Sequence, residues 1–167
     1  MIEVFDDLLS EEDFTILSEQ VASEEFAWYY LPGTIETMHM KGDTPQFATM
    51  FDNENSRKIA KQAILRSKRQ SVEIDDFLRI KANLLLPMPN RPAFHPPHVD
   101  TTEEGYLSVV YYLHDSDGDT FFFGDDNRTV TPKANRGVLF DSNIRHASSN
   151  PIATQRRMII NSVFRPK

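Results

Sequence analysis

The sequence predicts a mainly β domain of the α+β class, in which two N-terminal helices support a small antiparallel barrel or jelly roll. Two helical patterns lie before residue 77, whereas short apolar and β-branched runs follow one another after it. Turn signals such as Asp117-Gly118-Asp119 separate these runs. A chain of 167 residues predicts one domain, 1–167, with supporting elements in about 1–76 and the barrel core in about 77–167.

The first helix is predicted to begin after Ser10, because residues 10–13 read Ser-Glu-Glu-Asp and resemble a capping box. Apolar side chains then follow at helical spacing, at Phe14, Leu17 and Val21. A second helix is predicted over about 56–70, and it carries six of the 18 basic residues. We interpret its basic face as solvated, because no aromatic residue is interleaved for stacking on nucleic-acid bases.

Several runs have the length and composition of strands. They cover residues 26–31, 46–51, 77–86, 106–114, 120–123, 128–131, 137–140 and 156–164. Residues 86–97 contain five of the ten prolines. Because proline removes backbone donors from a sheet, this segment is predicted to be a rigid rim or lid beside the barrel.

The composition excludes several classes of function. The chain has no cysteine, so a metal must be bound by His, Asp or Glu. The formal net charge of −7 disfavours nucleic acid as a partner. No run approaches the roughly 18 apolar residues of a membrane span, and the first residues lack the basic region of a signal peptide. We therefore expect no membrane partner and a cytoplasmic protein, in the host cytoplasm if a phage encodes it; the oligomeric state is not specified.

His98 and Asp100 are the strongest candidates for chemistry. In an extended strand, side chains two positions apart point to the same side, so this imidazole and carboxylate can reach one point. His146, which follows the predicted strand 137–140 and a polar turn, is the best candidate for a third ligand. Two histidines and one carboxylate on one face of an octahedron are diagnostic of non-haem Fe(II) oxygenases. Structural histidines are the competing interpretation.

Arg156 stands ten residues after His146, at the start of the last predicted strand. Alternation along that strand predicts that one set of side chains faces the barrel interior. This set is Arg156, Met158, Ile160 and Ser162. A guanidinium in an apolar barrel needs an anion, and its fork matches a carboxylate. The neighbouring Arg157, on the opposite face, is expected to form a surface ion pair.

The order and spacing of these motifs resemble the 2-oxoglutarate- and Fe(II)-dependent dioxygenases, and within them the prolyl 4-hydroxylase-like branch. The matching segments are residues 98–100, 107–113, 118–121, 130–133, 137–141, 146–148 and Arg156. They lie within the stretch from about Arg79 to Phe164, which is about half of the chain. The resemblance implies a double-stranded β-helix, which is a jelly-roll or cupin-like barrel.

By position, the resemblance implies that His98, Asp100 and His146 bind iron and form the catalytic centre. It also implies that Arg156 pairs with the distal carboxylate of 2-oxoglutarate and that the Tyr112 hydroxyl binds the same carboxylate; a core aromatic is the alternative for Tyr112. The implied cofactors are Fe(II), 2-oxoglutarate as cosubstrate, dioxygen, and ascorbate as a candidate reductant. The implied reaction hydroxylates a C–H bond of a small molecule, peptide or protein, such as a peptidyl proline, and releases succinate and carbon dioxide.

Two alternative functions stay open. AlkB-type nucleic-acid demethylases use the same iron site, but they carry a second arginine six residues after the first, whereas Arg165 is nine residues after Arg156. A cupin-like protein that binds a metal or small acid without catalysis is the other alternative. Cupins favour two histidines in the first motif, and this chain has one there.

The remaining predictions concern residues around the site. His95 in the proline-rich rim is expected to be exposed, and Asn83 and Arg145 are candidates for the substrate mouth. His39 and His114 lack ligand-like spacing. The candidate cavity walls are Phe121, Phe123, Leu139, Met158 and Ile160.

Overall fold

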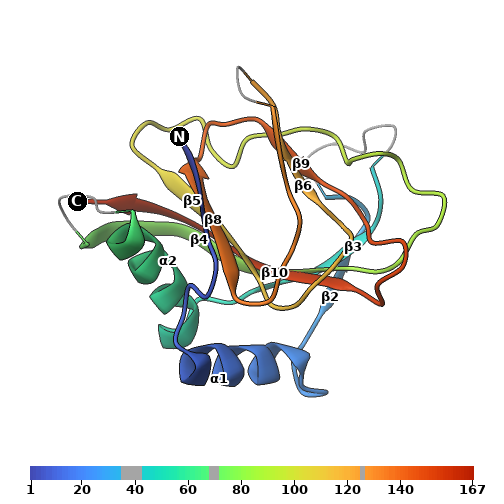
Figure 1. Ribbon diagram of the computed structural model, residues 1–167, viewed down its shortest axis with the longest axis horizontal. Coiled ribbons are helices and arrows are strands. Elements are labelled where there is room, and N and C mark those ends of the chain that lie inside the picture. The colour runs from blue at the N-terminus through green and yellow to red at the C-terminus, as the bar shows by residue number, and fades with distance from the viewer. Residues whose placement is uncertain (35–42, 68–71, 125–126) are drawn as a thin grey trace.

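The computed structural model describes residues 1–34, 43–67, 72–124 and 127–167, and within them the chain forms two antiparallel sheets (Figure 1). In this part of the chain, the larger sheet has seven strands in the order β1-β8-β5-β10-β4-β3-β2, and the smaller sheet has the order β7-β6-β9. The strands are β1 Ile2–Phe5, β2 Tyr29–Leu31, β3 Gln46–Met50, β4 Ile74–Leu85, β5 Leu107–Tyr112, β6 Thr120–Phe122, β7 Arg128–Val130, β8 Arg136–Asp141, β9 His146–Ser148 and β10 Arg157–Pro166. The predicted jelly roll is confirmed.

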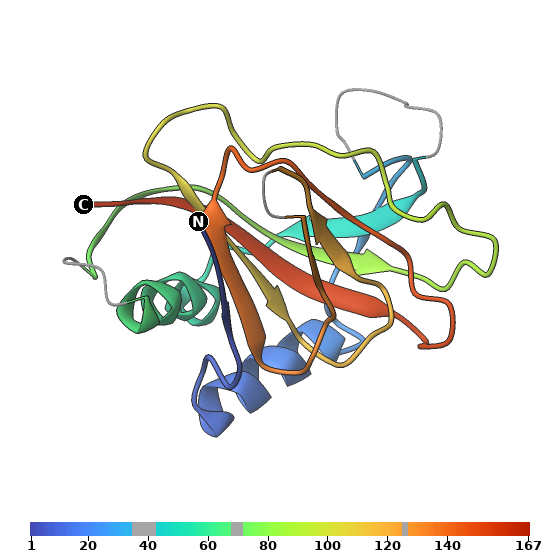
Figure 2. The same ribbon diagram turned by 45° about the horizontal axis from the view of Figure 1, so that its top comes forward.

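Helices α1 (Glu11–Ala22) and α2 (Glu54–Arg66) lie together against one face of the larger sheet (Figures 1 and 2). The Ser10 hydroxyl accepts a hydrogen bond from the Asp13 N–H at 3.2 Å, as the predicted cap requires. α2 begins earlier than predicted, because Asn53 and Ser56 form a capping box. Its expected end near residue 70 lies outside the described residues. No helix in the described segments combines the length and the apolar composition needed to cross a membrane.

The larger sheet buries both of its faces, and β10 shows this most clearly. Met158 and Ile160 pack in the cluster that joins the helices to the sheet. Ile159 packs in a second cluster, between the two sheets, with Val110 and Phe122. Because strand side chains alternate, the odd-numbered residues 157, 159 and 161 face the barrel interior.

Local sequence patterns do not reveal β1 and β9. β1 pairs with β8 from Ile2 opposite Phe140 to Phe5 opposite Gly137. β9 has three residues and pairs with β6 in the smaller sheet. Both are edge strands of the described sheets, and distant pairing rather than local composition makes them strands.

Candidate active site

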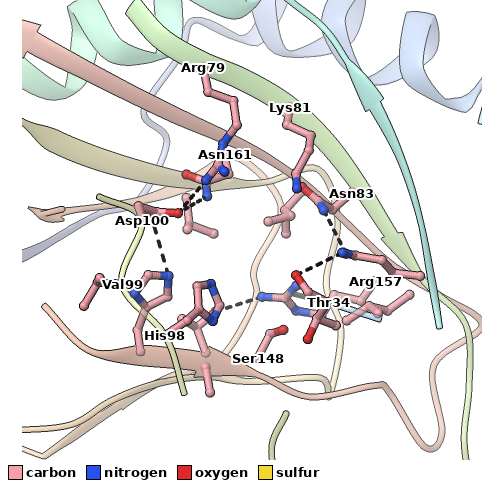
Figure 3. A pocket seen from close by; sticks show the side chains of 17 residues that line it. Thr34, Arg79, Lys81, Asn83, His98, Val99, Asp100, Ser148, Arg157 and Asn161 are labelled. Atoms are coloured by element: carbon pink, nitrogen blue, oxygen red, sulfur yellow. Dashed lines mark hydrogen bonds and ion pairs between the residues drawn. The ribbon is translucent and has the colours of Figure 1, made fainter. Parts of the chain in front are cut away.

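A cavity of about 310 Å³ opens inside the barrel, lined by residues of both sheets and of the segment that follows β4 (Figure 3). Among the described residues, its charged and histidine lining consists of Arg79, Lys81, His98, Asp100, His146 and Arg157. Its apolar lining consists of Leu85, Val99, Val110, Ala147 and Ile159.

The predicted cavity walls do not line this cavity. Leu139, Met158 and Ile160 pack against the helices instead, on the other face of the larger sheet. Phe121 and Phe123 stack on Phe94, with ring centroids 5.6 and 5.1 Å apart. All five are apolar residues in barrel strands or, for Phe123, directly after one, but none of them lines the cavity.

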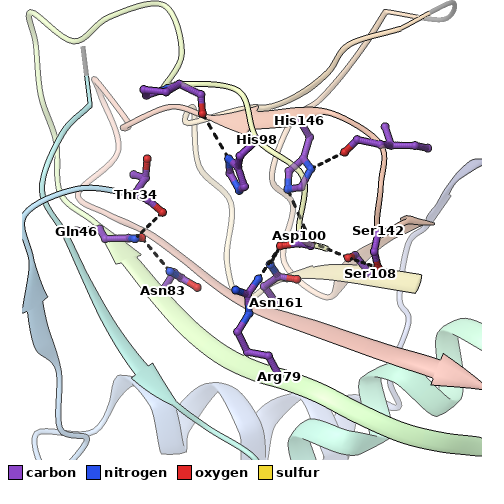
Figure 4. Close-up of polar contacts among 12 residues, drawn as sticks. Thr34, Gln46, Arg79, Asn83, His98, Asp100, Ser108, Ser142, His146 and Asn161 are labelled. Atoms are coloured by element: carbon purple, nitrogen blue, oxygen red, sulfur yellow. Dashed lines mark hydrogen bonds and ion pairs between the residues drawn. The ribbon is translucent and has the colours of Figure 1, made fainter. Parts of the chain in front are cut away.

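The structure brings His98, Asp100 and His146 together (Figure 4). A pair of backbone hydrogen bonds joins the two histidines: His98 N–H to His146 O at 2.9 Å, and His146 N–H to His98 O at 2.8 Å. One nitrogen of each ring and a carboxylate oxygen of Asp100 all lie within 4.8 Å of one another. Segments 48 residues apart therefore meet in one group with the composition of a metal site.

Backbone carbonyls orient the two imidazoles. His146 Nδ1 donates to Ile144 O at 2.9 Å and His98 Nδ1 donates to Pro96 O at 3.4 Å, so Nε2 of each ring is left as an acceptor. Burial and the neighbouring His146 lower the pKa of His98 to about 4. The His98 ring is therefore neutral at neutral pH, which is the form that binds a metal.

Asp100 has a side chain with 0% exposure and three close donors. They are Arg79 Nη2 at 2.6 Å and Asn161 Nδ2 at 3.0 Å on Oδ1, and Ser108 Oγ at 2.6 Å on Oδ2. Burial alone would raise the pKa of Asp100, but His146, Arg79 and Ser108 outweigh it and hold that pKa below its ordinary value. Asp100 is therefore a carboxylate in the folded protein.

The predicted placement of Arg156 is wrong: Arg156 is exposed, and Arg157 lies in the cavity with 3% of its surface exposed. Arg157 Nε donates to Gly118 O at 2.7 Å and Nη2 donates to Thr120 Oγ1 at 2.8 Å. Among the described residues it forms no ion pair with a carboxylate. The alternation along the strand was correct, but the set with Met158 and Ile160 faces the helices, so the neighbouring set enters the barrel.

Tyr112 is fully buried and lies behind Thr120 rather than on the cavity wall. Its hydroxyl donates to Thr120 Oγ1 at 2.8 Å, and the Arg157 guanidinium lies 5.7 Å from the centre of its ring. Burial raises the pKa of Tyr112, so the phenol keeps its proton. The hydroxyl that lines the cavity here belongs to Thr120.

His95 is buried with 1% exposure, which corrects the prediction of an exposed rim histidine. Its Nδ1 lies 2.9 Å from Ser148 Oγ and its Nε2 lies 2.7 Å from Asn150 Oδ1. These contacts arise because the proline-rich rim folds back onto the end of β9 and the residues that follow it; the His95 N–H also donates to Ser148 O at 2.8 Å.

Asn83 lines the cavity and donates to Gln46 Oε1 at 2.8 Å, whereas Arg145 is exposed and lies outside the lining. His114 accepts the Met158 N–H at 3.1 Å, away from the cavity, and His39 lies outside the described residues. Sequence patterns missed Arg79 and Asn161. Their signal is polar residues at alternate positions of strands that are otherwise apolar.

Residues 86–165 match the model of the 2OG-Fe(II) oxygenase superfamily. A search of curated proteins gives no significant match. Solved structures with a similar fold include a Pseudomonas putida prolyl-4-hydroxylase, with a TM-score of 0.68 and 19% identity over 99% of this chain and 92% of that chain.

Two further structures have the same fold. A Trichoplax adhaerens prolyl hydroxylase in complex with a hypoxia inducible factor peptide has a TM-score of 0.68 and 15% identity, covering 98% of this chain and 83% of that chain. The epimerase SnoN in complex with Fe3+, alpha ketoglutarate and nogalamycin RO has a TM-score of 0.67 and 11% identity, covering 98% and 78%.

The residues matched by the family model include His98, Asp100, His146 and most of the barrel strands. Residues 86–165, just under half of the chain, therefore have the pattern of the 2OG-Fe(II) oxygenase superfamily, which supports an iron- and 2-oxoglutarate-dependent oxidoreductase, and the chain as a whole has the fold of a prolyl 4-hydroxylase.

Proposed function

We propose that this chain hydroxylates a substrate C–H bond, with iron held by His98, Asp100 and His146 and with 2-oxoglutarate anchored by Arg157. One observation carries the proposal: a single cavity holds a His-Asp-His group and a buried guanidinium that forms no carboxylate ion pair within the described residues. The overall reaction combines the substrate, dioxygen and 2-oxoglutarate, and it yields the alcohol, succinate and carbon dioxide. One oxygen atom enters the alcohol and the other enters succinate.

The donor set fits ferrous iron. Two imidazoles offer Nε2 and a buried carboxylate offers oxygen, and three protein donors of this kind would leave coordination positions open for reactants. Iron, when bound, supplies the activation of dioxygen and the oxidative decarboxylation of 2-oxoglutarate. The protein holds the ligands in place and keeps the His98 imidazole neutral. Val110 and Ile159 exclude water from part of the cavity.

The other end of the cavity fits a carboxylate. A fully buried cation that bonds only neutral oxygen atoms is costly unless an anion joins it, and a guanidinium binds a carboxylate in bidentate fashion. Thr120 supports this role, because its oxygen accepts hydrogen bonds from both Tyr112 and Arg157. Both of its lone pairs are then used, so its own proton is available to donate to the cosubstrate. Arg157 therefore takes the role that the sequence predicted for Arg156, and Tyr112 acts through Thr120.

Anaerobic titration with Fe(II) and 2-oxoglutarate tests the proposal. We expect a visible metal-to-ligand charge-transfer band that appears only when both are present, and slow succinate formation once dioxygen is admitted. His146→Ala is expected to abolish the band by removing a ligand. A protein that shows neither a band nor succinate would contradict the proposal, and metal binding without turnover would indicate the cupin-like alternative.

The substrate we favour is a prolyl residue in a peptide, or else a small molecule. Support comes from fold relatives of both kinds, since the Trichoplax enzyme is in complex with a peptide and SnoN with nogalamycin RO. Screening peptides and amino acids for succinate release together with a 16-dalton mass gain tests this choice. The demethylase alternative receives no support from Arg165, which is exposed and pairs with Asp75 at 3.3 Å outside the cavity.

A further inference from the structure

We infer that Arg79 and Asn161 are positioning residues that leave Asp100 a single oxygen, Oδ2, with which to bind the metal. This inference rests on the proposed function, because it concerns the same metal site. It concerns residues that contact the Asp100 carboxylate and would act on the metal through it (Figures 3 and 4).

The hydrogen-bonding capacity of the carboxylate carries the argument. Each carboxylate oxygen has two lone pairs. On Oδ1, Arg79 Nη2 at 2.6 Å and Asn161 Nδ2 at 3.0 Å occupy both. On Oδ2, the Ser108 hydroxyl at 2.6 Å occupies one. Within the described residues the remaining Oδ2 lone pair faces His146 Nε2, which lies 3.8 Å away.

The surroundings fix this arrangement from several elements. Ser108 is held by Ser142, whose hydroxyl lies 2.9 Å away and whose carbonyl accepts the Asp100 N–H at 3.0 Å. The amide of Asn161 is oriented by Asp100, because the reverse orientation would place its oxygen against Oδ1. Asn161 Oδ1 is buried and has no hydrogen-bond partner in the described structure. The amide therefore donates to Asp100 while its own oxygen is left without a donor, which is energetically costly.

The strands that carry Arg79 and Asn161, β4 and β10, also carry an exposed arginine–aspartate pair that can be compared with Arg79–Asp100. Arg165 on β10 pairs with Asp75 on β4 at 3.3 Å, and both side chains are more than 40% exposed. Exposed pairs of this kind contribute little to stability. The Arg79–Asp100 pair has a buried carboxylate and a shorter separation, and it sits against the proposed metal.

Two consequences follow for the metal. With Oδ1 occupied, Asp100 cannot chelate through both oxygens, so a coordination position that a second oxygen would fill stays open for reactants. The Arg79 charge also withdraws electron density from the only described acidic ligand of the group. A ligand set with less negative charge favours Fe(II) over Fe(III), because the ferric ion gains more from anionic ligands.

Co(II) is the probe for the test, because its visible spectrum reports coordination number without any turnover. Arg79→Gln and Asn161→Ala are compared with wild type and with Arg165→Gln as the matched control. We expect both cavity variants to change the Co(II) spectrum and to bind Co(II) roughly 10- to 100-fold more weakly. The Fe(III)/Fe(II) midpoint potential of Arg79→Gln is expected to be lower than that of wild type. Arg165→Gln is expected to leave all three measurements unchanged.

Chemical rescue separates positioning from general damage to the fold. Guanidinium ion added to Arg79→Ala is expected to restore the wild-type Co(II) spectrum, since a quarter of the Arg79 side chain is open to solvent. If Arg79→Gln does not fold, Asn161→Ala still tests the inference through the other partner of Oδ1. Wild-type affinity and spectrum in both cavity variants would overturn the inference alone, whereas absence of Co(II) binding to wild type would overturn the proposed function with it.

Discussion

The two ends of the cavity differ in how their charge is balanced. At the end that holds Asp100, the carboxylate pairs with Arg79 and accepts hydrogen bonds from Asn161 and Ser108. At the other end, Arg157 bonds only neutral oxygen atoms of Gly118 and Thr120. The first end is balanced by the chain itself, and the second is the end that we propose receives an anion from outside. If the proposal is right, the Arg157 end should gain stability when 2-oxoglutarate binds, whereas the carboxylate at the Asp100 end already has its partners within the chain.

At the Arg157 end, hydrogen bonds to the backbone hold in place the loop that precedes Arg157. Asp117 accepts hydrogen bonds from the N–H groups of Ile152, Ala153 and Thr154, at 2.8 to 3.2 Å. Burial would raise the pKa of Asp117, but the hydrogen bonds from Thr154 and these N–H groups hold it below its ordinary value. This turn fixes the loop that leads into Arg157 and leaves the guanidinium little freedom to seek another partner.

The largest effect is expected from Arg157→Gln, which removes the uncompensated charge. Truncating one partner of a buried charged pair costs about 2 to 5 kcal/mol, so the Kd for 2-oxoglutarate should rise roughly 30-fold to several thousand-fold. Isothermal titration of the iron-loaded protein under nitrogen measures this change. Arg156→Gln is the matched control and should keep wild-type affinity. Loss of 2-oxoglutarate affinity in Arg156→Gln alone would instead assign carboxylate binding to Arg156, as the sequence predicted.

Gly118→Ala is expected to have the next largest effect, because it disturbs the backbone around Gly118, whose carbonyl accepts the hydrogen bond from Arg157 Nε. A Cβ at residue 118 would lie 2.6 Å from Ser149 O and 2.9 Å from Arg157 Cδ. We expect about a tenfold rise in the Kd for 2-oxoglutarate and a loss of about 1 to 3 kcal/mol in the free energy of unfolding. Metal affinity should not change, because the Asp100 end is held separately.

Gly137→Ala is the control for that variant. Its Cβ would meet Leu8 Cδ2 at 2.5 Å, the end of a flexible side chain outside the cavity. It should lower stability less and leave the Kd for 2-oxoglutarate unchanged. Equal loss of cosubstrate binding in both glycine variants would mean that the backbone around Gly118 has no specific role in binding.

The pH dependence of the free energy of unfolding, measured on the metal-free protein, tests the histidine end of the cavity, because His98 titrates in acid and Arg157 does not. The pKa of His98 is about 4 in the folded protein and about 6.5 when unfolded, so the unfolded chain binds more protons between these values. The free energy of unfolding should therefore fall, on the order of 2 kcal/mol from this group, as pH decreases from 6.5 toward 4. His95 and His114, whose pKa values burial also lowers, act in the same direction.

Urea unfolding at several pH values measures this dependence. His98→Gln should show a shallower decline than wild type. Arg157→Gln should change the slope less, because a guanidinium does not titrate there and acts only through its charge on His95 and His114. A slope that is unaffected in His98→Gln would show that the proton uptake lies elsewhere.

The three candidate metal ligands could be selected from the sequence, while the partners of Asp100 and the residues of the Arg157 end could not. His98 and Asp100 are two positions apart, and the polar turn before His146 marks the return of the chain to the barrel. These are local features. Arg79 and Asn161 contact Asp100 from distant strands, and no local pattern shows that β4 and β10 are neighbours.

The error at Arg156 has a physical cause. A strand with one buried face alternates between polar and apolar residues, but β10 is buried along eight consecutive residues. Alternation then separates two sets of side chains without showing which set faces the helices. A signal existed in the composition, because Met158 and Ile160 are apolar, as a helix interface requires, while Arg157 and Asn161 are polar, as the cavity requires.

The smallest effect is expected from Tyr112→Phe, which tests how far the Arg157 end extends. The Tyr112 hydroxyl reaches Thr120 rather than the cavity, so its loss should change the Kd for 2-oxoglutarate by less than about threefold and lower stability by about 1 kcal/mol. Thr120→Val removes the cavity hydroxyl that we propose donates to the cosubstrate, and it should weaken binding by about tenfold. Equal losses of 2-oxoglutarate affinity in the two variants would indicate that the Tyr112 hydroxyl contacts the cosubstrate directly and does not act through Thr120. A loss confined to Thr120→Val would make Tyr112 a support that acts only through its neighbour.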